Sequence, residues 1–236
     1  MDLKGVNALV TGAGRGIGAA IARSLAEAGC DLALAARTEA ELASVAAEVR
    51  AAGRRALVVP TDLTRPDETR ALAERALREL GPIDVLVNNA GGGVFQSVLA
   101  MSEEDFERTI ELNLTSVFRL TKALLPSMVQ RRKGHVVMIA STSARRGSAG
   151  SGAYAAAKFG LNGFAQSLFY ETRKHDVRVT TVFPSSVNTV LMRGLDDGAR
   201  AERWIQPEDI AEAVLAALQT PDRATVKEIE VWGTNP

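Results

Sequence analysis

Short apolar runs rich in β-branched residues recur along the chain, and longer stretches with a helix-like pattern separate them. Most of the short runs are apolar on both faces, as expected of parallel strands covered by helices on either side. Alternating strands and helices need right-handed crossovers, which build an open, doubly wound parallel sheet. The sequence therefore predicts one α/β domain over residues 1–236 with a seven-stranded, mostly parallel sheet. The predicted strands are Asn7–Thr11, Leu32–Ala36, Ala56–Pro60, Val85–Asn88, His135–Ala140, Val177–Phe183 and Ile229–Trp232.

Local signals mark where several of the intervening helices begin. Thr38 with Glu41, and Ser102 with Asp105, have capping-box spacing, in which side chains bind the free amides of the first turn. Pro207 suits a first helical turn, where a missing N–H costs nothing. Three helix starts are therefore expected at these positions.

A glycine-rich turn follows the first predicted strand. The strand runs into Thr11-Gly12-Ala13-Gly14-Arg15-Gly16-Ile17-Gly18, and the helix-like stretch Ala19–Ala28 comes next. Glycines permit positive φ and let backbone amides approach a ligand, while the helix N-terminus favours a pyrophosphate. A plain tight connection is the alternative, but glycines recurring at the first turn of the first βα unit favour a phosphate-binding turn.

The spacing Gly12-x-x-x-Gly16-x-Gly18, preceded by Thr11, resembles the nucleotide-binding turn of classical short-chain dehydrogenases/reductases. The resemblance extends over essentially the whole chain and implies a Rossmann-type fold, which binds ligands at the carboxyl ends of its strands. Asp62-Leu63 follows the third strand, where the family's aspartate contacts adenine. Asn88-Asn89-Ala90-Gly91 matches the family's turn after strand four, so Asn89, Ala90 and Gly91 are expected to lie along the cofactor.

Two arginines indicate which dinucleotide the turn binds. NAD-binding units place an acidic residue near the end of the second strand, where it accepts hydrogen bonds from the ribose. Here that strand ends in Arg37, which can hold a 2′-phosphate, and Arg15 can approach from the glycine turn. The alternative is that both are merely solvated surface charges. The pair favours NADP(H) over NAD(H).

Tyr154 and Lys158 stand four residues apart, so a helix places them on the same side. A nearby ammonium favours the phenolate and is expected to lower the pKa of the tyrosine from about 10. Tyr154 can then serve as general acid in carbonyl reduction or as base in alcohol oxidation. Ser141 follows the fifth strand, where its hydroxyl can hydrogen-bond a carbonyl oxygen as charge develops.

Asn113 lies inside the predicted helix Glu103–Arg132, where an amide is not a preferred helix former. In the family that the chain resembles, a matching asparagine holds a water that connects the lysine to solvent. The resemblance thus implies a catalytic tetrad of Asn113, Ser141, Tyr154 and Lys158.

The stretch after the sixth strand departs from the family pattern, which usually has Pro-Gly before a Val-x-Thr element. The chain reads Pro184-Ser185-Ser186-Val187-Asn188-Thr189. Val187 and Thr189 remain available for the nicotinamide carboxamide, but Ser185 cannot adopt positive φ as cheaply as glycine. The segment Ser185–Ile205 has weak periodicity, mixed charge and two glycines, and is a candidate for a mobile lid.

Loops after strands four, five and six are expected to form the substrate pocket. Small or apolar walls suit a ketone or an acyl chain better than a sugar, which needs several placed polar partners. The resemblance is greatest to 3-oxoacyl-[acyl-carrier-protein] reductases. The predicted pocket walls are Phe95, Ser143, Gly150, Leu191 and Met192, and the predicted substrate contacts are Ser141, Ser143, Tyr154 and Ser185.

Charge and cysteine content narrow the choice of partners. Lys plus Arg equals Asp plus Glu at 28 each, so no net field gathers nucleic acid or an anionic membrane. No apolar run is long enough for a bilayer, and the first residues lack signal-peptide features, so a cytoplasmic location is expected. The single cysteine, Cys30, is read as a buried core residue, and no metal site is expected.

Two questions of assembly stay open. The predicted helices Glu103–Arg132 and Gly152–Lys174 have apolar residues on more than one face, and related enzymes usually assemble through them into dimers or tetramers. An acidic acyl-carrier protein would need basic docking residues, for which Arg131-Arg132-Lys133 and Arg173-Lys174 are candidates. The competing explanation is that cations favour helix C-termini whatever the partner.

The expected reaction is NADPH-dependent reduction of a ketone or 3-oxoacyl thioester by hydride transfer. The same residues also fit an alcohol dehydrogenase that works in the oxidative direction, because a catalyst does not set the equilibrium. A catalytically silent dinucleotide-binding protein is the non-enzyme alternative. The Tyr154/Lys158 pair argues against that alternative.

Overall fold

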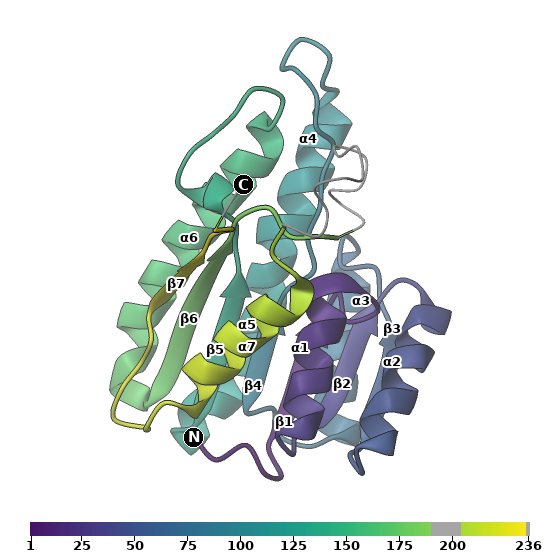
Figure 1. Cartoon of the computed structure of the whole chain (residues 1–236), viewed down its shortest axis with the longest axis vertical. Helices are drawn as coiled ribbons and strands as arrows, with labels where there is room; N and C mark the ends of the chain where they lie inside the picture. Colours follow the sequence, from purple (N-terminus) through teal and green to yellow (C-terminus); the bar gives the residue numbers. More distant parts are fainter. Residues whose placement is uncertain (190–203, 235–236) are drawn as a thin grey trace.

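One parallel sheet with helices on both faces makes up the computed structural model, which describes residues 1–189 and 204–234 (Figure 1). The sheet has seven strands in the order β3-β2-β1-β4-β5-β6-β7, and every neighbouring pair is parallel. This confirms the predicted doubly wound α/β fold. The strands are β1 (Asn7–Thr11), β2 (Asp31–Ala36), β3 (Ala56–Pro60), β4 (Val85–Asn88), β5 (Gly134–Ile139), β6 (Val177–Pro184) and β7 (Glu228–Val231).

The helices alternate with the strands along the chain. They are α1 (Gly16–Glu27), α2 (Glu39–Ala51), α3 (Pro66–Glu79), α4 (Glu103–Ile110), α5 (Ser116–Arg131), α6 (Gly152–Thr172) and α7 (Pro207–Gln219), with a π-helical turn η1 (Glu111–Thr115) and two 3-10 turns, η2 (Thr142–Ala144) and η3 (Arg173–His175). The predicted continuous helix over residues 103–132 is therefore wrong in one respect, because η1 interrupts it between α4 and α5. The second predicted long helix, Gly152–Lys174, ends two residues early and continues as the 3-10 turn η3.

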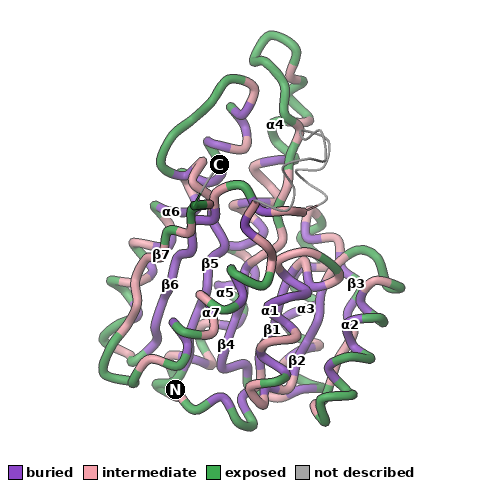
Figure 2. Tube along the Cα trace, in the orientation of Figure 1, coloured by how far each residue is buried: buried purple, intermediate pink, exposed green. Residues whose placement is uncertain are grey.

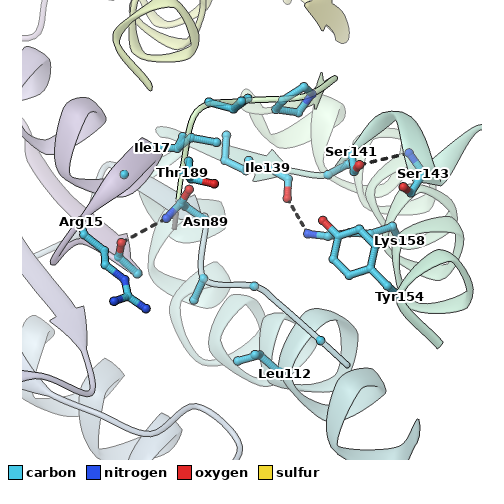
Figure 3. A pocket seen from close by; sticks show the side chains of 18 of the residues that line it. Arg15, Ile17, Asn89, Leu112, Ile139, Ser141, Ser143, Tyr154, Lys158 and Thr189 are labelled. Carbon is cyan, nitrogen blue, oxygen red and sulfur yellow. Dashed lines mark hydrogen bonds between the residues drawn. The ribbon is translucent and has the colours of Figure 1, made fainter. Parts of the chain in front are cut away.

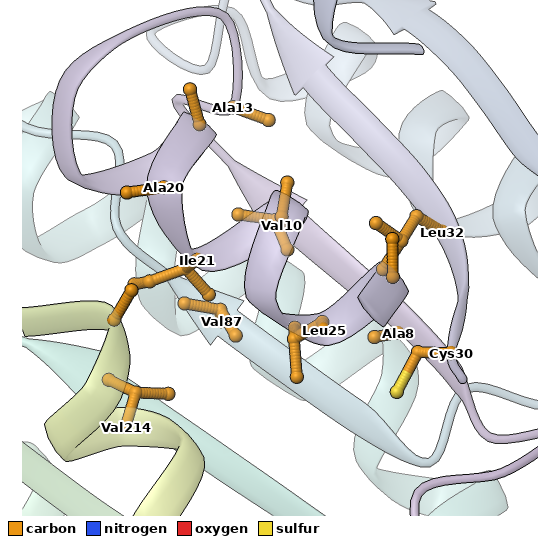
Figure 4. Close-up of a cluster of buried hydrophobic side chains, with 14 of the residues drawn as sticks. Ala8, Val10, Ala13, Ala20, Ile21, Leu25, Cys30, Leu32, Val87 and Val214 are labelled. Carbon is orange, nitrogen blue, oxygen red and sulfur yellow. The ribbon is translucent and has the colours of Figure 1, made fainter. Parts of the chain in front are cut away.

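Two apolar layers sandwich the sheet. Side chains alternate along β1, so that Ala8 and Val10 pack under α1, α2 and α7, whereas Leu9 packs under α3, α5 and α6. Figure 4 shows the first of these layers, and Figure 2 shows the inner strands buried along most of their length, whereas the edge strands β3 and β7 are more exposed. Cys30 lies in that first layer as a free, buried thiol, and burial raises its pKa to about 12. Cys30 is therefore a buried core residue, as the sequence predicts.

The expected helix starts are borne out at all three positions. Ser102 accepts a hydrogen bond from the amide of Asp105, and Pro207 stands in the first turn of α7. Thr38 is the N-cap of α2 but forms no side-chain cap, so the capping box expected there is wrong. The carboxylate of Glu41 pairs with Arg15.

Within the two described ranges, no helix is both long and apolar enough to cross a membrane.

Candidate active site

A cleft of about 950 Å³ opens at the carboxyl edge of the sheet. Loops after the first six strands contribute to it, and α4 and α6 form part of its walls. Figure 3 shows the glycine-turn residues on one side of the cleft and Tyr154 and Lys158 on the other. Predicted site residues that line it are Gly12, Arg15, Gly16, Ile17, Arg37, Asp62, Leu63, Asn89, Ala90, Gly91, Ser141, Ser143, Tyr154, Lys158, Ser185, Val187 and Thr189.

The glycine turn has the backbone geometry that its sequence predicts. Gly12 and Gly16 have φ of +64° and +55°, values that favour glycine. A Cβ on Gly18 would lie 2.2 Å from the carbonyl oxygen of Gly12, so no side chain fits there. α1 starts at Gly16 without a side-chain cap, which leaves amides of its first turn free for an anion.

Thr11 fastens this turn to the end of β4. Its hydroxyl oxygen accepts hydrogen bonds from the amides of Asn89 and Ala90, both at 3.0 Å. The side-chain amide of Asn89 donates in return to the carbonyl of Thr11 at 2.8 Å. Thr11 and Gly18 do not line the cleft themselves. They fix the backbone of the glycine turn, which does line it.

Charges surround one end of the cleft. Arg15 pairs with Glu41 at 3.4 Å, whereas Arg37 makes no ion pair with any described residue. Burial opposes ionisation of Asp62, but hydrogen bonds from Thr64 and the charges of Arg37 and Arg108 together hold the pKa of Asp62 below its ordinary value.

Lys158 lies buried at the other end, one turn after Tyr154 on α6. Its ammonium donates a hydrogen bond to the carbonyl of Ile139 at 2.9 Å and lies 5.6 Å from the centre of the Tyr154 ring. Because burial removes water from the charged amine, the pKa of Lys158 falls to about 8. The predicted convergence of the two side chains is met.

The pKa of Tyr154 shifts against the sequence-based expectation. Burial raises it, and a side-chain hydrogen bond with Ser141 offsets only part of that effect. The expectation that the ammonium lowers this pKa is therefore wrong for the protein alone, because desolvation of the phenolate is the larger effect. The phenol is protonated at neutral pH.

Asn113 sits in the π-helical turn η1 and not in a regular helix. Its side-chain nitrogen donates to the carbonyls of Gly92 at 2.6 Å and Thr109 at 2.8 Å, and its oxygen accepts from the amide of Gly92 at 3.2 Å. Asn113 is fully buried and does not line the cleft. It holds the loop after β4 against α4, next to Lys158.

A family model described as short chain dehydrogenase matches residues 6–199. This chain is a short-chain dehydrogenase. Its family consists of oxidoreductases that bind a nicotinamide dinucleotide.

Two curated relatives are similar to this chain over nearly their whole length. Sepiapterin reductase of Chlorobaculum tepidum is 37% identical, with 94% of this chain and 93% of that protein covered. The 3-oxoacyl-[acyl-carrier-protein] reductase of Vibrio cholerae is also 37% identical, over 96% of this chain and 94% of that protein.

Solved structures of the family superpose closely on the chain. A metagenomic short-chain oxidoreductase in complex with NADP has a TM-score of 0.88 at 37% identity, with all of both chains covered. A 7α-hydroxysteroid dehydrogenase in complex with NADH and a 7-oxo bile acid has a TM-score of 0.91 at 29% identity, over 98% of this chain and 94% of that chain. The family's members thus include binders of either dinucleotide.

Ser185 does not need the positive φ that glycine supplies. Among the described residues other than glycine, only Arg132 and Asp176 have positive φ. The amide of Ser185 donates to the carbonyl of Val231 at 2.9 Å, which keeps the start of the loop in line with β7. The sequence left the effect of serine at this turn open; in the structure the turn needs no positive φ, and Val187 and Thr189 still reach the cleft.

Some predicted pocket residues are not found in the cleft. Phe95 and Ser143 line it, but Gly150 does not, although Ser148, Ala149 and Ser151 beside it do. Leu191 and Met192 lie outside the described residues, as does most of the candidate lid, residues 190–203.

Arg108 and Leu112 are cleft residues that the sequence analysis missed. Both come from the α4 side, four positions apart, and line the cleft together with Asp62 and Asn89. Their helical spacing was the available signal. The turn η1 changes which side chains reach the cleft.

The two basic groups considered for docking lie away from the cleft. Arg131 binds Asp84 at 2.5 Å and the carbonyl of Ile83 at 2.8 Å, and Arg132 binds Asp176 at 2.8 Å. These contacts stand where α5 leads into β5, at the amino edge of the sheet. Arg131 and Arg132 stabilise the fold at the amino edge, so they are poorly placed for docking a partner at the cleft entrance.

Proposed function

We propose that this short-chain dehydrogenase uses NADPH to reduce a carbonyl, a ketone or a 3-oxoacyl thioester, to a secondary alcohol. One observation carries the proposal: Ser141, Tyr154 and Lys158 line the same cleft as the glycine turn. The kinship with two named reductases supports the reductive direction.

The cleft fits a dinucleotide. Gly12, Gly14 and Gly16 line it with partly exposed backbone, next to the N-terminus of α1, which has no side-chain cap. We assign Asp62 and Leu63 to the adenine, Asn89 to Gly91 to the middle of the cofactor, and Val187 and Thr189 to the carboxamide. When bound, the dinucleotide supplies the hydride that adds to the carbonyl carbon.

Tyr154 supplies the proton for the carbonyl oxygen. A phenol whose pKa is raised by burial stays protonated at neutral pH, as a general acid must. Ser141, which lines the cleft beside that phenol and partly offsets the rise in its pKa, is placed to bind the same substrate oxygen. With a pKa of about 8, Lys158 is mostly charged at neutral pH and stabilises the phenolate left after proton donation.

Small and apolar walls around Tyr154 favour the proposed substrates. The Phe95 ring centre lies 5.4 Å from that of Tyr154, and Ser143, Ser148 and Ala149 complete the lining nearby. A flat or extended carbonyl compound fits such walls better than a sugar.

Replacing the phenolic oxygen tests the reaction. Tyr154→Phe should still bind NADPH but lose nearly all turnover, at least about a hundredfold for a missing general acid. The assay follows NADPH oxidation over ketones, 3-oxoacyl thioesters, quinones and steroids. Normal turnover in the variant would overturn the mechanism. If the wild type oxidised NADPH with none of these substrates, the result would favour a catalytically inactive dinucleotide-binding protein. Faster reaction with alcohols and NADP⁺ would favour an alcohol dehydrogenase.

The cofactor assignment depends on Arg37, which is exposed and makes no ion pair with a described residue. Arg37→Ala should weaken NADPH binding and leave NADH binding almost unchanged, because only NADPH carries the 2′-phosphate. Titration of both dinucleotides against both proteins measures this. Tighter binding of NADH than NADPH by the wild type would refute the preference.

We further propose that the chain assembles into homodimers or homotetramers through α5 and α6. Phe118 on α5 and Phe159 on α6 remain 45% and 47% exposed. Exposed rings of this size are typical of contact surfaces. Light scattering with Phe118→Ser and Phe159→Ser tests the idea, and an unchanged mass would count against it.

A further inference from the structure

The adenosine end of the cleft has a cationic side chain on its α4 wall that the proposed function leaves unused. Arg108 lines the cleft together with Asp62 and Leu112. It is exposed, and no hydrogen bond or ion pair joins its guanidinium to another described residue.

The acidic residues at helical spacing do not engage it. Glu111, three positions later, is occupied by Arg119, which pairs with both of its oxygens. Glu104, four positions earlier, forms no ion pair in the described part of the chain. A guanidinium that is free of neighbours on its own helix is available to a ligand in the cleft.

Arg108 also lies near the group that we assign to adenine. Its charge acts on Asp62 strongly enough to help lower the pKa of that carboxyl. Asp62 follows β3, so the two residues come from different walls of the same part of the cleft. Leu112, one turn along from Arg108, adds an apolar surface beside it.

We propose that Arg108 covers the adenine of the bound dinucleotide from the α4 side, with its planar guanidinium stacked on the base. This inference rests on the proposed cofactor site. A guanidinium is weakly hydrated and stacks on aromatic faces, which a purine also presents. Since adenine is common to both dinucleotides, Arg108 contributes to the affinity for NADPH and NADH alike, whereas Arg37 contributes to NADPH alone.

Titration of both dinucleotides with four proteins tests the proposal: wild type, Arg108→Ala, Arg37→Ala and Arg223→Ala. Arg223 is the matched control, because it is exposed, unpaired among the described residues and distant from the cleft lining. Arg108→Ala should raise Kd for NADPH and for NADH by the same factor, about 3- to 30-fold for a stacked cation. Arg223→Ala should change neither.

Arg108→Lys separates stacking from charge. Lysine keeps the charge but not the plane, so its affinity for both dinucleotides should fall between those of wild type and Arg108→Ala. The stacking role would be overturned if Arg108→Lys bound both dinucleotides as tightly as the wild type. It would also be overturned if Arg108→Ala kept the wild-type affinity, or if its affinity fell for NADPH alone. If the wild type bound neither dinucleotide, the proposed function itself would fail, which distinguishes the two outcomes.

Discussion

Gly91 leaves no room for a side chain beside Asn113 and Lys158. A Cβ built there would lie 2.8 Å from the side-chain oxygen of Asn113 and 3.3 Å from the ammonium nitrogen of Lys158. Asn113 cannot yield easily, because its amide is held by Gly92 and Thr109. The absence of a side chain at Gly91 is what lets Asn113 and Lys158 come together.

Gly91→Ala should therefore lower turnover about 10- to 100-fold, since a displacement of about 1 Å near reacting groups has effects of that size. Steady-state rates at saturating substrate, with unfolding midpoints measured in parallel, check this. Gly163→Ala is the control: it lies on α6 with nothing within 4 Å of its added Cβ, so its turnover should match the wild type. Equal rates for the two variants would contradict the argument.

At the residue scale, the spacing of residues along the sequence predicted their positions in the site, whereas their pKa shifts and backbone conformations depended on the folded surroundings. The separation of Tyr154 and Lys158 by one helical turn places both in the cleft, as their positions in the sequence predict. The direction of the pKa shift at Tyr154 depends on how much water the fold removes, and neighbouring charge alone misjudges it. The conformation of Ser185 was likewise left open by the sequence; the structure shows no positive φ there and a hydrogen bond from its amide to the carbonyl of Val231.

At the scale of the elements, the same cap signal has two outcomes. Ser102 caps α4, whereas Thr38 stands at the N-cap of α2 without a side-chain bond. Ser102→Ala should lower the free energy of unfolding by about 1 kcal/mol, and Thr38→Ala by much less. Urea denaturation of both variants measures the difference. Equal losses would mean that the cap geometry is not what distinguishes these two helices.

Strands were more predictable than helices for a physical reason. A strand buried on both faces, such as β2, is apolar over its buried residues, and its end is marked by the polar residues that follow. The turn η1 has no comparable mark, because the inserted residue is stabilised by Asn113 bonding to Gly92, a residue 21 positions away. Periodicity along one segment does not contain that contact.

The whole molecule divides its tasks between the two edges of the sheet. The carboxyl edge holds the cleft, while ion pairs such as Arg131 with Asp84 tie helices to strands at the amino edge. The parallel topology, which the sequence predicts, makes this division unavoidable, since all strands end on the same side. The sequence did not predict at which edge of the sheet each arginine acts, because that depends on partners that only the fold brings close.

His135 makes the stability of the whole fold sensitive to acid. It is fully buried on β5, with Nε2 2.7 Å from the Thr180 hydroxyl, and Nδ1 has no partner among the described residues. Burial, followed by the charges of Arg178 and the N-terminus, lowers its pKa to about 3. The imidazole therefore stays neutral in the folded chain under conditions in which the unfolded chain binds a proton.

Since the folded pKa lies below the unfolded value of about 6.5, the stabilisation is complete above pH 6.5 and is lost as the pH falls towards 3. One extra proton on the unfolded chain corresponds to about 1.4 kcal/mol per pH unit within that window. His135→Gln should flatten the pH dependence of the unfolding free energy between pH 6.5 and 4.5, whatever it does to the level at pH 7. His175→Gln, in the 3-10 turn η3, is the control and should keep the wild-type slope. Urea denaturation across this range gives the three slopes, and a variant as steep as the wild type would show that His135 is not the group that titrates.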